Sequence, residues 1–159
     1  MSSLQEAVHD FLSQKRIAVV GVSSKRETPA NGIYRKLKKS GYQVFPVTPN
    51  AETFDGDACF ADLLSIPQQV DSVVVITRPE VTEQVVHQCV DAGISRVWMH
   101  RSLGFFPTSV SEQAVQFCRE NDIAVIPGGC PMMFCEPVDF GHKCMRWMLN
   151  LTGGLPKHI

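Results

Sequence analysis

The chain has 159 residues, a length that suits one domain with a sizeable hydrophobic core. Its 15 Lys and Arg and 16 Asp and Glu give a net charge of -1, so no overall positive field would attract nucleic acid or an anionic membrane. No apolar run approaches the ~20 residues of a membrane span, and the polar N-terminus does not resemble a signal peptide. We therefore expect a cytoplasmic protein that binds neither nucleic acid nor a membrane.

The chain carries six cysteines, at positions 59, 89, 118, 130, 135 and 144. Their scattered spacing, without a signal peptide, predicts reduced thiols rather than disulfides. No pair fits a CxxC motif. Cys130 and Cys135, with His142 beyond them, come nearest to a zinc motif, but their spacing is not that of a zinc site, and we expect no metal.

Hydrophobic periodicity predicts alternating helices and strands. A first helix over 4–12 follows a capping box formed by Ser3 and Glu6. Apolar, largely β-branched runs predict five buried strands, at 17–20, 43–47, 72–76, 95–99 and 123–126. The other helices are expected at 32–39, around 61–64, and at 79–92, 110–121 and 140–151. Ser109 and Glu112 would cap the helix over 110–121, and residues 152–159 would form a tail.

Strands that alternate with helices imply a parallel sheet with right-handed crossovers. We expect an α/β fold: a Rossmann-like doubly wound parallel five-stranded sheet with helices on both faces, in a single domain over 1–159 with its core at about 11–150. The expected strand order is 3-2-1-4-5, which puts the topological switch between the first and fourth strands. Ligands of such sheets bind beyond the carboxyl ends of the strands at the switch, so the loops there form the candidate site.

The loop after the first strand has the residue types of a phosphate cradle. Gly21 lets the backbone turn sharply, and Ser23 and Ser24 bring hydroxyl and amide groups to the position of a pyrophosphate. The following helix start, near residues 31–32, adds a partial positive charge, and Lys25 and Arg26 add full charges. The alternative is a solvated basic loop without a ligand.

This loop differs from the loop of an NAD site. The glycine fingerprint would need glycines at positions 23 and 26, where Ser23 and Arg26 stand. The second strand is followed by Thr48, Pro49 and Asn50, without the carboxylate that would bind the ribose diol of NAD. A neutral strand end beside basic residues suits a nucleotide with an extra ribose phosphate, and both coenzyme A and NADP are of that kind.

Three later loops also carry candidate residues. Arg78 follows the third strand, beside Pro79, and its guanidinium can form two hydrogen bonds to a phosphate. A local salt bridge of Arg78 is an equal alternative. His100, after the fourth strand, is either an acid–base group or an ordinary hydrogen-bonded histidine. Cys130, after the fifth strand, is either a nucleophile or a buried packing residue. Residues 132–134 would line a channel for a thiol arm or cover the end of the sheet.

Five motifs in order resemble the CoA-binding domain family, whose small standalone members are similar to the N-terminal domain of the succinyl-CoA synthetase α subunit. The motifs are IAVVGVS at 17–23, GYQVFPVTP at 41–49, PQQVD at 67–71, RP at 78–79 and GISRVWM at 93–99. The resemblance spans roughly residues 11–148. It departs from the common pattern at Thr48, at 100–104, and at 128–130 and 135–137, and nothing resembles the synthetase domain that carries the phosphorylated histidine.

The resemblance implies a Rossmann-like fold that binds coenzyme A or an acyl-CoA across the carboxyl ends of the strands. The residues that it assigns to the pyrophosphate are Val22, Ser23 and Ser24. Those at the adenosine side are Thr48, Pro49 and Asn50, and those flanking the nucleotide are Thr77, Arg78 and Pro79. The loop with His100, Ser102 and Gly104 would meet the pantetheine arm.

Our leading interpretation is a non-catalytic module that binds coenzyme A or an acyl-CoA and buffers, senses or presents it, with a protein partner or as a homodimer. One alternative is an acyl- or thiol-transfer enzyme that uses Cys130 with His100 or His142. A second alternative is an NADP-dependent oxidoreductase, against which the missing glycine counts.

Overall fold

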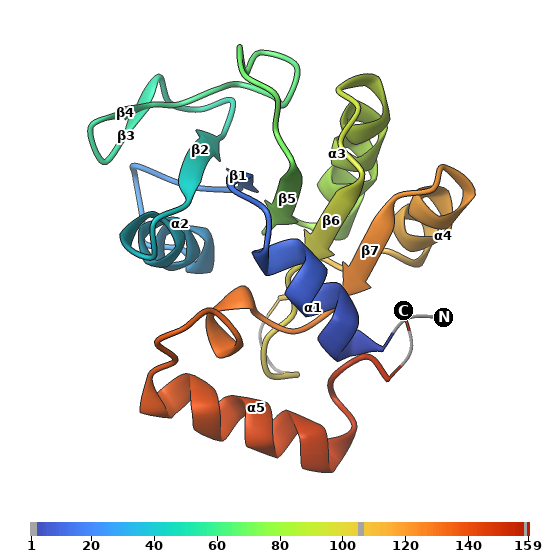
Figure 1. The fold of residues 1–159 in the computed structure, drawn as a ribbon. Helices are drawn as coiled ribbons and strands as arrows, with labels where there is room; N and C mark the ends of the chain where they lie inside the picture. Colours follow the sequence, from blue (N-terminus) through green and yellow to red (C-terminus); the bar gives the residue numbers. More distant parts are fainter. Residues whose placement is uncertain (1–2, 105–106, 158) are drawn as a thin grey trace.

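The computed structural model describes residues 3–104, 107–157 and 159, and in them helices and strands alternate as the sequence predicts (Figure 1). The first half of the chain forms α1 (Leu4–Leu12), β1 (Arg16–Val20), α2 (Pro29–Lys39), β2 (Gln43–Val47), β3 (Thr53–Phe54) and β4 (Asp57–Ala58). The second half forms β5 (Ser72–Val75), α3 (Pro79–Asp91), β6 (Arg96–Met99), α4 (Glu112–Glu120), β7 (Ala124–Pro127), the 3-10 turn η1 (Pro131–Met133) and α5 (Phe140–Thr152).

The main sheet has five parallel strands in the order β2-β1-β5-β6-β7. The α/β Rossmann-like fold is therefore confirmed, but the expected order 3-2-1-4-5 is wrong. Counted along the chain, the order is 2-1-3-4-5, because the third long strand pairs with β1 and not with β2. The topological switch consequently lies between β1 and β5, one strand away from the expected position.

The chain after β2 explains this order. Phe60 lies along the outer edge of β2, where its amide donates to the carbonyl of Pro46 at 3.0 Å and its carbonyl accepts from the amide of Thr48 at 2.8 Å. This edge is thereby covered, and β5 joins the sheet on the far side of β1. Pro46 itself has no amide hydrogen to donate, which favours an edge position for its strand.

Two hydrophobic layers cover the faces of the sheet. Helices α3 and α4 pack on one face, and α1, α2, η1 and α5 pack on the other (Figure 1). Trp98 of β6 lies at the centre of the second layer, where its ring meets that of Phe11 edge-on at 5.3 Å and its indole nitrogen donates to the carbonyl of Gly128 at 2.9 Å. The expectation of helices on both faces is confirmed.

Three local predictions need correction. The expected short helix around residues 61–64 is a bend followed by a turn. Helix α4 is capped by Ser111, whose hydroxyl accepts from the amide of Ala114, and not by Ser109. The expected tail packs against the domain, since Leu155 is buried with the core residues beside Gly129. None of the helices in the described residues has the length and hydrophobicity needed to cross a membrane.

Candidate functional site

Gly21 is the point at which three of the predicted loops meet. Its amide donates to the carbonyl of Val47, the last residue of β2, at 3.0 Å. On its other side, a Cβ atom at this position would lie only 2.0 Å from the carbonyl oxygen of Ile76, which follows β5. Its φ of +113° also favours glycine. The loops after β1, β2 and β5 therefore start side by side at the switch point.

Asn31 organises the loop after β1 and is the most important residue that the sequence analysis missed. It lies in the first turn of α2 and is almost completely buried. Its Oδ1 accepts from the amide of Ser23 at 2.9 Å, and its Nδ2 donates to the carbonyls of Ser23 and Arg26 at 2.9 and 3.1 Å. These bonds close the loop into one conformation, which leaves the side chains of Ser24, Lys25 and Arg26 exposed.

The start of α2 lies next to this loop. The helix begins at Pro29, three residues earlier than expected, and Thr28 caps it by accepting from the amide of Asn31. The first turn of α2 contains no acidic residue, whereas that of α3 contains Glu80. A helix N-terminus favours an anion. Here the carboxylate of Glu27, the residue before the cap, already lies 3.4 Å from Nδ2 of Asn31, and it also pairs with Arg35.

Three cations lie near the switch point. Lys25, Arg26 and Arg78 are exposed and form no ion pair with any residue in the described ranges. By contrast, Arg35 in the same helix as Asn31 binds two carboxylates at 2.6 Å each. The alternative interpretation of Arg78 as half of a local salt bridge is therefore wrong, and its guanidinium is available to a ligand.

The loop after β5 is held by Ser109, which does not cap α4 as the sequence predicts. The amide of Thr77 donates to the hydroxyl of Ser109 at 3.0 Å. The hydroxyl of Thr77 lies 3.0 Å from that of the buried Thr82. Pro79 begins α3, as the sequence predicts. The backbone beneath Arg78 is thus fixed, while its side chain is free.

The loop after β2 has one buried and two exposed residues. Thr48 is buried, and its hydroxyl accepts from the amide of Asn50 at 3.4 Å. Pro49 and Asn50 are exposed. Thr48 therefore shapes the turn, and only the other two residues present atoms to a ligand.

The loop after β6 does not lie at the switch point, contrary to expectation, because β5 separates β6 from β1. His100 is buried, and this burial lowers its pKa to about 4, so the imidazole is neutral at pH 7. The hydroxyl of Ser102 donates to the sulfur of Met145 in α5 at 3.6 Å, and Gly104 is exposed. The contact of Ser102 thus connects this loop to α5.

Cys130 lacks the properties of a nucleophile. It is buried, and burial raises the pKa of its thiol to about 11, so the thiol is protonated at neutral pH. All six cysteines are free. His142 pairs instead with Asp139 at 2.6 Å, and the described part of the chain contains no group of three or more residues arranged to hold a metal ion.

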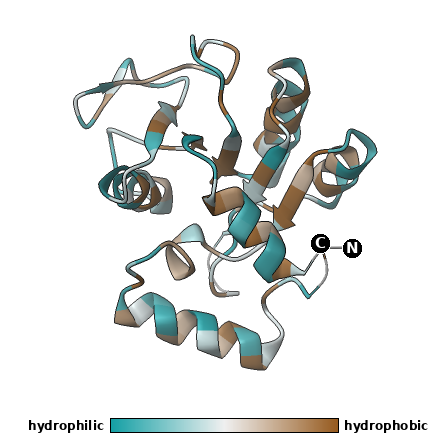
Figure 2. Cartoon of the chain, viewed as in Figure 1, coloured by the Kyte–Doolittle hydropathy of each residue, from teal (hydrophilic) through white to brown (hydrophobic). Residues whose placement is uncertain are grey.

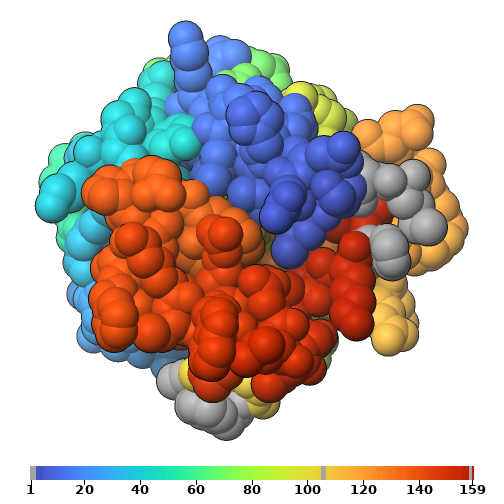
Figure 3. All heavy atoms as spheres, turned by 60° about the horizontal axis from the view of Figure 1, so that its bottom comes forward, coloured from blue at the N-terminus to red at the C-terminus, as the bar shows by residue number. Residues whose placement is uncertain are grey.

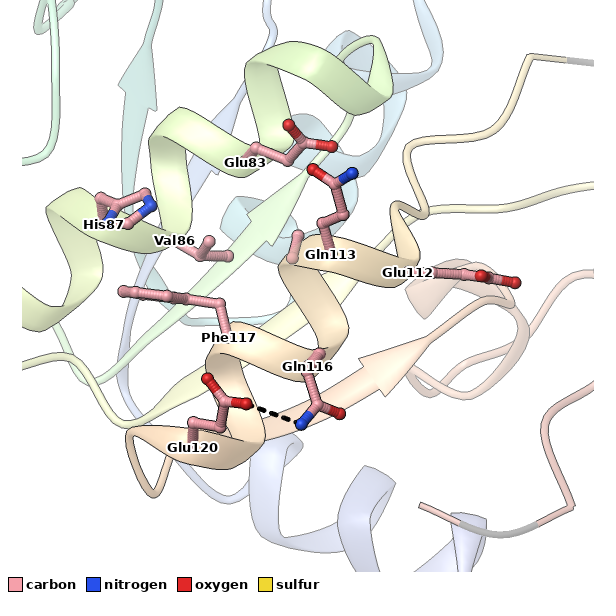
Figure 4. Close-up of a pocket in the computed structure, with 9 residues that line it drawn as sticks. Glu83, Val86, His87, Glu112, Gln113, Gln116, Phe117 and Glu120 are labelled. Atoms are coloured by element: carbon pink, nitrogen blue, oxygen red, sulfur yellow. Dashed lines mark hydrogen bonds between the residues drawn. The ribbon is translucent and has the colours of Figure 1, made fainter.

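A separate cavity lies between α3 and α4, with a volume of about 520 Å³ (Figure 4). Glu83 and His87 line it from α3, and Phe117 lines it from α4. Two further carboxylates, of Glu112 and Glu120, also border it. Three carboxylates repel a polyphosphate, so the loops around Gly21 remain the candidate nucleotide site.

The chain is similar to several known proteins. The chain is 29% identical over 89 residues to the ADP-forming acetate–CoA ligase II of Archaeoglobus fulgidus, a match that covers 55% of this chain but only 13% of the ligase. It is 28% identical over 116 residues to the uncharacterized protein YneT of Bacillus subtilis, which covers 73% of this chain and 82% of that protein.

Among solved structures, a hypothetical protein from Pyrococcus horikoshii OT3 is 26% identical and has a TM-score of 0.76, with 87% of this chain and 96% of the other covered. The sequence profile of the CoA binding domain matches residues 15–136, which include all five strands of the main sheet and the loops that meet at Gly21. The chain therefore belongs to the CoA binding domain family.

Proposed function

We propose that this protein binds coenzyme A or an acyl-CoA beyond the carboxyl ends of β1, β2 and β5. The pyrophosphate would lie against the loop of Val22, Ser23 and Ser24, at the N-terminus of α2. The adenosine side would lie toward Pro49 and Asn50, and Arg78 would reach a phosphate from the opposite side. The family assignment favours coenzyme A over NADP as the nucleotide.

One observation carries this proposal. The loop after β1 is closed by the buried Asn31, yet its three outward side chains and Arg78 form no ion pairs with the described residues. A loop with a fixed backbone that presents cations beside a helix N-terminus is preorganised to bind an anion.

We further propose that the protein acts without catalysing a reaction, as a module that buffers, senses or presents the cofactor to a protein partner in the cytoplasm. The protonated thiol of Cys130 and the weakly basic His100 support this view, since neither is activated for acyl or thiol transfer. The ligase relatives are far longer than this chain, and their reaction is not part of the proposal.

Calorimetric titration of the purified protein tests the proposal. Coenzyme A should bind, pantetheine alone should bind much more weakly, and a comparison with dephospho-CoA measures the contribution of the ribose phosphate. Arg78→Ala should weaken coenzyme A binding by about 10- to 100-fold, because a charge-assisted hydrogen bond to phosphate is lost. The matched control is Arg119→Ala, which removes an exposed arginine of α4. No binding of coenzyme A by the unaltered protein would refute the proposal.

A second variant tests the loop after β1 independently of Arg78 in the loop after β5. Ser23→Phe would place a large side chain at the loop that is proposed to hold the pyrophosphate, and it should abolish binding while the protein stays folded. If the Ser23 variant bound normally while Arg78→Ala did not, the phosphates would have to lie against α3 and not against α2.

A further inference from the structure

Helix α5 carries an apolar stripe on the side that faces away from the domain. Phe140, Trp147 and Leu151 are 81%, 67% and 67% exposed, and Cys144 is exposed between them. We call these four residues the α5 stripe. Figure 2 shows hydrophobic residues recurring along α5 at the edge of the molecule, and Figure 3 shows this helix as a broad part of the surface. Exposed large hydrophobic side chains grouped in this way mark an interaction surface.

The stripe does not serve the packing of the domain itself. Leu149, on the opposite side of α5, is buried in the core, and Met145 packs against the core beside it. Arg146 lies over the ring of Phe134, with its guanidinium carbon 5.0 Å from the ring centroid, so it is turned toward its own domain. The helix therefore has a complete inner face and a second apolar face without a partner among the described residues.

The spacing of the stripe points to its partner. The intervals between its residues are four, three and four positions, which read the same in either direction. On an antiparallel copy of the same helix, Phe140 would face Leu151, and Cys144 would face Trp147. We infer that α5 is a dimerisation helix, which packs against α5 of a second copy of this chain around a two-fold axis.

Charge and area set the strength of this pairing. Helix α5 contains Lys143 and Arg146 but no acidic residue, so charge does not attract two copies of it. Arg146 is turned toward Phe134 of its own copy, and Lys143 would lie beside Asn150 of the second copy, which keeps these cations apart at the contact. The two aromatic side chains of each copy would remove roughly 300 Å² from water. Both copies thus supply about half of the roughly 1,200 Å² that a small specific interface buries, so we expect a weak dimer.

Sedimentation of the full chain over a range of concentrations tests this inference. The unaltered protein should dimerise with a dissociation constant in the micromolar range, as fits a small interface. Trp147→Glu should weaken dimerisation by about 30-fold or more, because it places a charge in the interface where an aromatic residue packs. Leu64→Glu is the matched control: Leu64 is 55% exposed but lies in the loop before β5, so this variant should dimerise normally.

Two measurements test the antiparallel arrangement. The two copies of Cys144 would lie about 4.5 Å apart along the helix axes, so mild oxidation should link them, and Cys144→Ser should abolish the link. A chain carrying Trp147→Glu, mixed with a chain carrying Cys144→Lys, should form a heterodimer in preference to either homodimer. In the heterodimer, the new glutamate at position 147 of one chain faces the new lysine at position 144 of the other. At the second contact, the native Cys144 still faces the native Trp147.

Each contrary outcome overturns the inference. A protein that stays monomeric at concentrations on the order of 100 µM has no dimer of the expected strength. A dimer that Trp147→Glu does not weaken uses another surface, and the absence of both the Cys144 link and the heterodimer preference excludes the antiparallel pairing. Binding of a monomer to vesicles of anionic lipid, lost in Trp147→Glu, would show that a membrane surface covers the stripe.

Discussion

Asn31 and Ser23 are joined by two hydrogen bonds of 2.9 Å, one in each direction, between the side-chain amide of Asn31 and the backbone of Ser23. Asn31→Ala removes both bonds and leaves the part-buried amide and carbonyl of Ser23 without these partners. We expect a loss of about 2–4 kcal/mol in the free energy of unfolding. Coenzyme A affinity should fall more than about tenfold, since the loop loses its fixed conformation.

Urea unfolding and calorimetric titration measure the two effects. Asn121→Ala is the control, because the side chain of Asn121 makes one exposed hydrogen bond at the end of α4. It should cost less than about 1 kcal/mol and leave affinity unchanged. Equal effects of the two variants would contradict the role assigned to Asn31.

Gly21→Ala should be among the most destabilising single-methyl changes in the chain. The added Cβ would lie 2.0 Å from the carbonyl oxygen of Ile76, and the φ of +113° is itself strained for alanine. We expect a loss of roughly 2–5 kcal/mol in urea unfolding. Gly41→Ala separates the two causes, because Gly41 also has a positive φ, of +95°, but open space around it. If both variants lost the same stability, the close approach to Ile76 would not matter.

Stability should decrease as the pH falls from about 6.5 to about 4, in part because of His100. Burial lowers the pKa of His100 from 6.5 to about 4, so in this window the unfolded chain binds a proton that the native protein does not. Protons therefore favour unfolding here, and the free energy of unfolding rises with pH.

His100→Gln removes this contribution. Between pH 7 and pH 4.5 the unaltered protein should lose roughly 2–3 kcal/mol more than the variant does. Carboxylates such as Asp71, whose pKa the bonded Arg16 lowers, contribute to both proteins and cancel in the comparison. Identical pH profiles in urea unfolding would mean that His100 titrates normally in the native protein.

Cys130 should react slowly with iodoacetamide. A thiol pKa of about 11 leaves roughly one thiolate in several thousand molecules at pH 7.5, and the side chain is also buried. Peptide mass spectrometry should show alkylation of Cys130 at least about 100-fold slower in the native protein than in the urea-unfolded chain. Rapid labelling in the native state would instead support a catalytic thiol.

The strand order was the main point at which sequence reasoning failed, although one residue carried the signal. Runs of β-branched residues identify a buried strand but do not say which strand lies beside it. Pro46 lacks an amide hydrogen, and an interior place between two strands, as the order 3-2-1-4-5 requires, disfavours it. In the structure β2 lies at the edge, and Phe60 covers it.

The two serines before α4 illustrate a different limit. Ser109 and Ser111 both precede an acidic or polar stretch at spacings that suit a cap, and local pattern does not choose between them. In the structure the hydroxyl of Ser109 accepts a hydrogen bond from the amide of Thr77, in the loop after β5, and Ser111 caps the helix. This contact joins residues that are 32 positions apart.

The sequence by itself determined the fold class, the five strands, most helices and the loops that hold candidate residues, because periodicity and turn-forming residues are local properties. The tertiary structure alone decided which loops are neighbours and that Asn31 is buried against Ser23. It also decided that Arg35 binds two carboxylates while Arg78 binds none among the residues that the structure describes. These features depend on the packing of segments distant in the chain. Only the folded backbone brings such segments within hydrogen-bonding distance.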